Sequence, residues 1–183
     1  VLKQSQEFAT EALNAHQRTL RMRGRPKIVL ARSYEEAMEL YEKYANNVLG
    51  VITDARYPRN GLVDPMAGIK LLGEIRKRDP FVPLILESSE VNNKEYARLY
   101  EASFVDKNSK KMNIDLREIV SENFGFGDFV FRNPNTMEEV ARVRNLKELQ
   151  NIIYSIPKES LLYHVQRNHV SRWLYSRAMF PAA

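Results

Sequence analysis

Residues 49–58 read Leu-Gly-Val-Ile-Thr-Asp-Ala-Arg-Tyr-Pro, and this stretch decides the fold that we expect. The run is apolar and short enough to be a buried strand, and it ends in the carboxylate of Asp54, followed by a turn. In an open α/β sheet, ligands bind in the crevice outside the carboxyl ends of the strands. The stretch therefore predicts that Asp54 lies at the edge of a sheet where chemistry takes place.

Short apolar runs and helical patterns alternate on both sides of this stretch. Ser33 followed by Glu36 is typical of a helix start, and Gly24 with Pro26 of a helix end. This alternation is typical of an α/β protein with a doubly wound parallel sheet and helices on both faces. The expected strands are 27–31, 49–54, 82–86 and 103–105, and the expected helices are 2–22, 33–45, 68–78, 94–101 and 113–123, with a loop at 56–65.

The pattern changes after residue 123, so we expect one domain at 1–123 and a mainly helical extension or linker at 124–183. Residues 124–131 (FGFGDFVF) alternate aromatic residues with glycine or polar ones, which predicts a short exposed strand or docking segment. Three helices are expected after it. They begin at the Thr136–Glu139 pair, at the Asn145–Glu148 pair and at about Lys158, the last running to Met179.

Composition narrows the class of protein. The chain has 183 residues, 44% of them hydrophobic and 28% charged, with a net charge of +5 and no cysteine. It contains no run of about 20 apolar residues, so we expect no membrane partner and a cytoplasmic location. The basic clusters at 18–27 and 76–78 lie at expected helix ends without interleaved aromatic residues, so we expect no nucleic-acid partner.

Polar residues follow three successive expected strands. They are Asp54, Ser88 and Lys107. If these strands are parallel neighbours, the three side chains meet in one crevice at the carboxyl edge of the sheet. A carboxylate, a hydroxyl and an ammonium suit phosphoryl transfer to the aspartate, because the carboxylate is the nucleophile and the lysine neutralises phosphoryl oxygens. The serine hydroxyl then bonds the group once it has arrived.

These residues resemble the receiver domain of bacterial response regulators. That family has a phosphoaccepting aspartate followed by proline four residues later (Asp54 and Pro58), a glycine opening the next helix (Gly68), and Ser88 and Lys107 at the ends of later strands. The resemblance covers about residues 1–123. It implies a flavodoxin-like fold and a regulatory role in a two-component phosphorelay. It also implies a sensor histidine kinase or phosphotransfer protein as partner, and no catalytic activity of the module itself.

Two departures from the family accompany this resemblance. Receivers hold Mg²⁺ with the phosphoacceptor, here Asp54, and an acidic pair that ends their first strand. No such pair is present in this chain and that first strand is missing, so Mg²⁺ is expected only if acidic residues precede Val1. Asn108 also stands where the family usually has proline, and the loop from Pro58 to Gly68 is longer than usual.

The C-terminal tail carries a second resemblance. Residues 160–177 (SLLYHVQRNHVSRWLYSR), preceded by FGFGDFVF, are similar to the segment that joins a receiver-like region to an enzyme of the phosphoenolpyruvate synthase or pyruvate-phosphate-dikinase type. This implies that the chain is the N-terminal regulatory part of a longer protein with a catalytic domain downstream. A homodimer is the other partner that we consider.

Alternative interpretations stay open at this stage. The main one is a degenerate receiver that acts only as a protein-interaction or dimerisation module, and another is a small enzyme using the same crevice.

Single residues outside the predicted site are expected to have structural roles. We expect Glu87 to face solvent or form a salt bridge, Thr53 to pack on the opposite face, and Trp173 to anchor a core or an interface. His164 and His169 are five residues apart, off the three- or four-residue spacing of one helix face, which favours surface or packing roles over a metal site.

Overall fold

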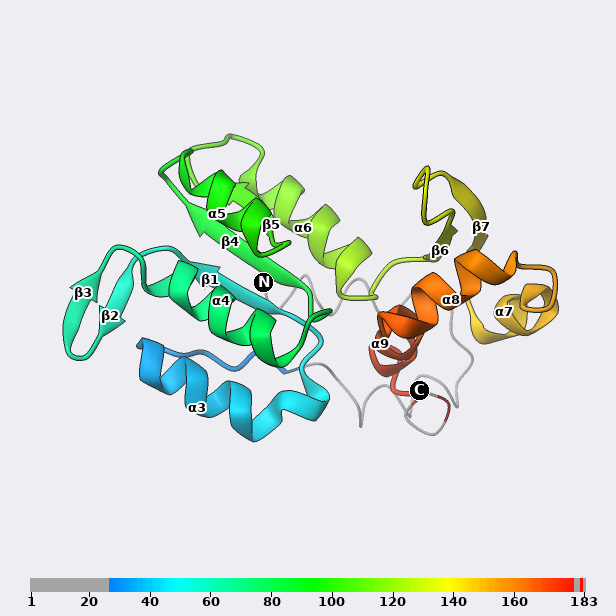
Figure 1. Ribbon diagram of the computed structural model, residues 1–183, viewed down its shortest axis with the longest axis horizontal. Helices are drawn as coiled ribbons and strands as arrows, with labels where there is room; N and C mark the ends of the chain where they lie inside the picture. The colour runs from blue at the N-terminus through cyan, green and yellow to red at the C-terminus, as the bar shows by residue number, and fades with distance from the viewer. Residues whose placement is uncertain (1–26, 180–181, 183) are drawn as a thin grey trace. The chain divides into compact units, whose positions relative to one another are not determined.

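The computed structural model describes residues 27–179 and 182 (Figure 1). Their contacts form two compact units, one comprising Ile28–Ile119 and the other beginning at Val120. The helix expected at residues 2–22 lies outside the described residues. Each unit is described separately below.

The first unit is built on a parallel sheet. Its strands are β1 (Val51–Asp54), β4 (Leu84–Ser88) and β5 (Ser103–Asp106), in the spatial order β1-β4-β5. Val51 is the register partner of Leu84, and Ile85 is the partner of Ser103. Helices connect these strands, as parallel pairing requires. The expected α/β class with a parallel sheet is therefore confirmed.

Three helices pack against this sheet through one apolar cluster. They are α3 (Tyr34–Tyr44), α4 (Ala67–Arg78) and α5 (Asn93–Leu99). The Ser33 side chain caps α3 by accepting a hydrogen bond from the Glu36 amide, as the sequence predicts. Helix α4 contributes most to the core because Leu72 and Ile75 are almost fully buried in it. The 3₁₀ turn η1 (Ala45–Asn47) follows α3, and α6 (Met112–Asn123) follows β5.

The strand expected at residues 27–31 is not formed. This segment has no regular secondary structure, and Ile28, Val29 and Leu30 are 53%, 55% and 72% exposed. An apolar run becomes a strand only when a neighbouring strand satisfies its backbone, and no described strand pairs with it. The prediction relied on local pattern alone and was wrong.

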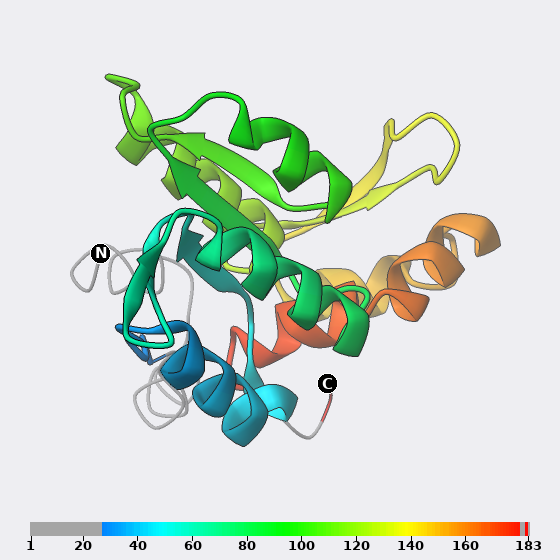
Figure 2. The same ribbon diagram turned by 60° about the vertical axis from the view of Figure 1, so that its left-hand side comes forward.

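A β-hairpin occupies the segment that was expected to be a loop. Strands β2 (Tyr57–Arg59) and β3 (Leu62–Asp64) pair antiparallel across a two-residue turn. The turn residues Asn60 and Gly61 have φ angles of 52° and 77°, which is the conformation that an Asn-Gly hairpin turn adopts. Figure 2 shows this hairpin beside α3 and α4, and the Asn60 amide donates a hydrogen bond to the Glu35 carboxylate of α3.

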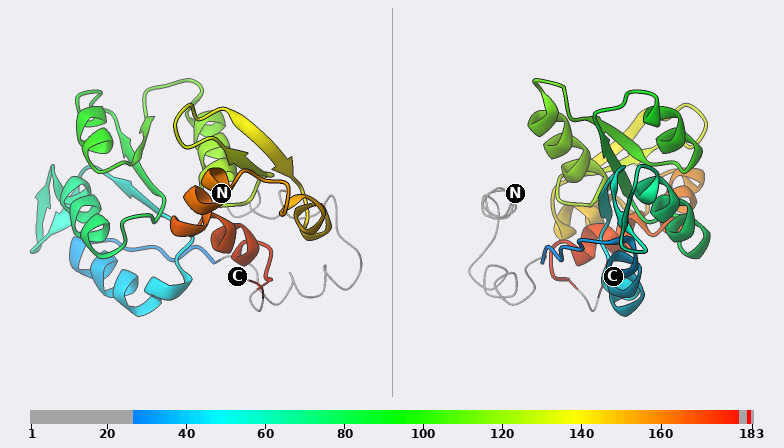
Figure 3. Two further views of the ribbon diagram at one scale, coloured as in Figure 1. Left: turned by 45° about the vertical axis from the view of Figure 1, so that its right-hand side comes forward. Right: turned by 90° about the vertical axis from the view of Figure 1, so that its left-hand side faces the viewer.

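The second unit is a hairpin packed against short helices (Figure 3). Phe129, Phe131, Val143 and Trp173 are buried in its core. Trp173 is therefore a core anchor, as expected, whereas the aromatic strand is buried and not exposed. The elements are β6 (Phe129–Arg132), β7 (Glu139–Val143), α7 (Leu146–Ile152), α8 (Lys158–Gln166) and α9 (His169–Tyr175).

Two of the three helices expected in this unit differ from the structure. Residues 139–143 form β7, because Thr136 lies in the hairpin turn and its hydroxyl accepts from the amide of Glu138. The last helix is broken into α8 and α9 at Asn168, whose φ is 58°. The start of α7 was predicted correctly, since Asn145 accepts a hydrogen bond from the Glu148 amide.

Candidate functional site

Asp54 and Lys107 form an ion pair at the carboxyl edge of the sheet. Asp54 is the last residue of β1, and Lys107 follows directly after β5. The Lys107 Nζ donates to Asp54 Oδ2, and both side chains keep access to solvent, at 34% and 42% exposure. The two residues that the sequence placed at strand ends are thus brought into contact from strands that are not neighbours.

Ser88 ends the strand between them. Its Oγ accepts hydrogen bonds from the Glu90 amide at 3.0 Å and from Asn93 Nδ2 at 2.9 Å, and both Ser88 and Asn93 are buried. Two donors occupy the oxygen lone pairs, so the hydroxyl hydrogen remains to be donated elsewhere. The Ser88 carbonyl accepts from the Lys107 amide, which ties the two strand ends together.

Gly68 brings helix α4 against the end of β1. Its amide donates to the Ala55 carbonyl at 3.0 Å. A Cβ atom at residue 68 would overlap the carbonyl oxygen of Asp54, which is backbone and cannot move aside. The glycine that the sequence placed at the opening of the helix is therefore required by this close approach.

Glu87 is a site residue that the sequence reasoning did not identify. It is the register partner of Asp54 across the β1–β4 pair and is only partly exposed. Burial raises the pKa of its carboxyl, while the Lys107 ammonium acts in the opposite direction and the Asp54 carboxylate adds to the increase. Strand alternation alone could not identify it, since residues 54 and 87 share a face only when the two strands pair in this register.

The hairpin is linked to the site through Tyr57. The Thr53 hydroxyl donates to the Asp54 carbonyl at 3.0 Å and lies 3.3 Å from the Tyr57 hydroxyl. Burial raises the pKa of Tyr57 to about 12, so this phenol stays protonated at neutral pH. Thr53 is itself buried, as expected from its alternation with Asp54.

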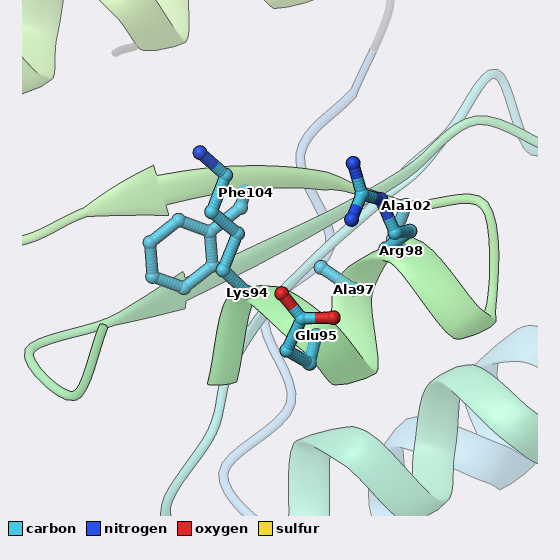
Figure 4. Close-up of a pocket in the computed structure, with 6 residues that line it drawn as sticks. All are labelled: Lys94, Glu95, Ala97, Arg98, Ala102 and Phe104. Carbon is cyan, nitrogen blue, oxygen red and sulfur yellow. The ribbon is translucent and has the colours of Figure 1, made fainter. Parts of the chain in front are cut away.

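A separate hollow of about 370 Å³ lies between α5 and β5. Figure 4 shows the side chains around it, with the ring of Phe104 on β5 and the charged groups of Lys94, Glu95 and Arg98 on α5. None of Asp54, Ser88 and Lys107 lines it. The hollow is therefore distinct from the strand-end site.

In the second unit, His164 and His169 lie in contact. Their Nδ1 atoms are 3.0 Å apart, and His164 Nε2 accepts from the Arg132 amide at 2.9 Å. The break at Asn168 ends α8 and is followed by α9, so the five-residue separation of His164 and His169 does not keep their rings apart. The sequence favoured a surface or a packing role for His164, and the structure decides between the two. The packing role is correct, because His164 is only 5% exposed.

The described residues contain neither a clustered set of metal ligands nor a membrane-spanning helix. Residues 27–179 and 182 contain no group of three or more histidine, aspartate or glutamate side chains arranged to hold a metal ion. Within the same ranges, no helix has both the length and the apolar character needed to cross a membrane.

Comparisons with known proteins give no assignment. The chain matches no protein-family model, no curated protein and no solved structure. The geometry at the ends of β1, β4 and β5 is therefore the basis for a functional proposal.

Proposed function

We propose that this chain is a regulatory module that accepts a phosphoryl group on Asp54. The observation that carries the proposal is the contact of Lys107 Nζ with Asp54 Oδ2 at the strand ends. An ammonium already bound to the carboxylate is a counter-charge in place for phosphoryl oxygens on that carboxylate. The finer fold assignment, a flavodoxin-like receiver domain, and the cytoplasmic location belong to the same proposal.

The residues divide the chemistry among them. Lys107 engages Oδ2, so Asp54 Oδ1 attacks the phosphorus of a phosphohistidine or of a small acyl phosphate. A P–O bond to Asp54 forms, and the P–N or P–O bond to the donor breaks, with the electron pair leaving on the donor. Ser88 alternates with Glu87 along β4, so its hydroxyl, whose oxygen already accepts two hydrogen bonds, turns at the strand end to donate its hydrogen to a phosphoryl oxygen.

Mg²⁺ is the cofactor that the receiver resemblance implies, and the acidic pair that accompanies the phosphoacceptor in that family is not found in this sequence. Mg²⁺ requires nearly octahedral oxygen coordination, and it usually takes one or two carboxylates together with waters. One oxygen of Asp54 is bound to Lys107, and no group of three ligating side chains occurs in the described ranges. The phosphoryl transfer written above therefore contains no step through the metal.

Phosphorylation of Asp54 changes the surface of the module around the strand ends, and this change is the signal that the module passes on. A phosphoryl group on Asp54 adds negative charge and draws Ser88 and Lys107 toward it, which shifts the population between two packings of the strand ends. The module itself catalyses no reaction of a substrate. Its partners in this proposal are a sensor histidine kinase or phosphotransfer protein as donor, and a second copy or a downstream domain of the phosphoenolpyruvate synthase type as receiver of the signal.

The test is phosphorylation of the whole chain with acetyl phosphate, read by intact mass, together with titration of beryllofluoride at millimolar concentration with and without Mg²⁺. We expect one phosphoryl group and shifted amide signals around Asp54, Ser88 and Lys107, all lost in Asp54→Asn. If neither reagent produces a change, the proposal fails. If the chain is instead a degenerate receiver that acts only through protein interactions, Asp54→Asn should assemble with its partners as the unmodified chain does.

A further inference from the structure

Glu87 and Asp54 stand side by side on adjacent strands. They are register partners in the parallel pair of β1 and β4. Side chains of paired residues leave the same face of a sheet, and neighbouring strands are about 4.8 Å apart. Lys107 reaches Asp54 from the end of β5. Two carboxylates and one ammonium therefore share one face at the strand ends.

The single ammonium is engaged by only one of the two carboxylates. Lys107 bonds Asp54, while no described residue forms a hydrogen bond or ion pair with the Glu87 carboxylate. Glu87 is nevertheless close enough for both groups to act on it electrostatically, and it is half-buried, where screening by water is weaker. Glu87 is therefore a second anion that competes for Lys107.

We propose that the Glu87 carboxylate lowers the affinity of Asp54 for phosphoryl groups. The inference rests on the proposed function. A phosphoryl group on Asp54 needs Lys107 as its counter-charge. A carboxylate beside it attracts the same ammonium and repels the phosphoryl oxygens. Both effects lower the affinity, so removing the charge of Glu87 strengthens binding.

The experiment compares beryllofluoride affinity between the unmodified chain and Glu87→Gln. The substitution removes one charge and keeps the shape of the side chain. We expect binding to be at least about threefold tighter, the lower limit given by one unit charge about 6 Å away at the dielectric constant of bulk water, about 80. The gain should shrink as the salt concentration rises.

Glu90→Gln is the matched control. Glu90 lies three residues beyond Glu87, is exposed, and pairs with Arg56 at 3.6 Å. It carries the same charge change without being the register partner of Asp54, so we expect affinity to change by less than about twofold. Unfolding curves of both variants check that each retains the fold.

The outcomes separate the two proposals. Equal affinities in the unmodified chain and Glu87→Gln would overturn this inference and leave the proposed function standing. Weaker binding in Glu87→Gln would also overturn it, because the carboxylate would then assist the site. Absence of any response in both proteins would overturn the proposed function and this inference with it.

Discussion

The rings of His164 and His169 form a directional chain of hydrogen bonds that begins at the Arg132 amide. His164 Nε2 accepts from this N–H, so the proton of the neutral ring lies on Nδ1 and is donated to His169 Nδ1, 3.0 Å away. Neutral His164 therefore carries its proton on Nδ1, and neutral His169 carries its proton on Nε2. A second proton on either ring turns an acceptor into a donor and breaks one bond of the chain.

The hydrogen bonds of His164 and His169 predict that the second unit loses stability in mild acid. Burial is the main cause that lowers the pKa of both His164 and His169 to about 4, and nearby arginines add to it. A depressed histidine pKa gives stability that is complete above the unfolded value of about 6.5 and is lost as the pH falls toward 4. Between pH 7 and 5 we expect a loss of about 2 kcal/mol from His164 and less from the partly exposed His169.

Trp173 provides the measurement. It is the single tryptophan of the chain, it is 1% exposed, and it packs edge-on against Phe129 in the same core as His164. Urea unfolding followed by its fluorescence should give a steep pH dependence in the unmodified chain. His164→Phe should be less stable at pH 7 but show a flatter dependence, and equal slopes would contradict the lowered pKa of His164.

The helix break at Asn168 gives a second prediction. A φ of 58° is the left-handed conformation, which costs residues with a Cβ roughly 1–2 kcal/mol, and asparagine least among them. Asn168→Gly should therefore be neutral or slightly stabilising, whereas Asn168→Ala should destabilise by about 1 kcal/mol although alanine favours helices. Thermal unfolding of the two variants, Asn168→Gly and Asn168→Ala, tests this prediction. Greater stability of the alanine variant would argue for a continuous helix.

The same residue shows where sequence reasoning stops. Helical spacing continues through residues 158–179, so periodicity alone predicts one helix and separates His164 from His169. Asn168 is a residue type that tolerates the left-handed conformation, but periodicity does not detect it, and the contact of Trp173 on α9 with Phe129 on β6 is not a local pattern. In contrast, the caps at Ser33 and Asn145 are local interactions and were predicted correctly.

Gly68 gives the third prediction. In Gly68→Ala the new Cβ would overlap the Asp54 backbone carbonyl, so α4 or β1 must move, and we expect a loss of about 2–4 kcal/mol. Gly73→Ala in the same helix is the control. Its Cβ would lie 3.1 Å from the Tyr100 ring, a side chain that can shift, and alanine favours the helix by about 1 kcal/mol. Similar losses in the two variants would refute the specific role of residue 68.

The site itself was predictable in part. Strand-end positions identified Asp54, Ser88 and Lys107, because the apolar runs before them are local signals, and Asp54 and Lys107 are in contact. Glu87 was not identified, because its role depends on which residue of β4 lies opposite Asp54. The register of strands distant in sequence is set by tertiary packing, and a shift of one residue would place Glu87 on the other face.

Ser88 gives the last prediction, which concerns a buried hydrogen bond. Ser88→Ala removes the acceptor of Asn93 Nδ2, which is buried, so the amide loses a partner in a place with little access to water. We expect a loss of about 1–3 kcal/mol by urea unfolding, although the volume hardly changes. The adjacent Ser89 is exposed, and Ser89→Ala should change stability by less than about 0.5 kcal/mol. A double variant, Ser88→Ala with Asn93→Leu, should recover part of the loss because both polar partners are then removed together, and failure to recover would place the cost elsewhere than in the unpaired amide.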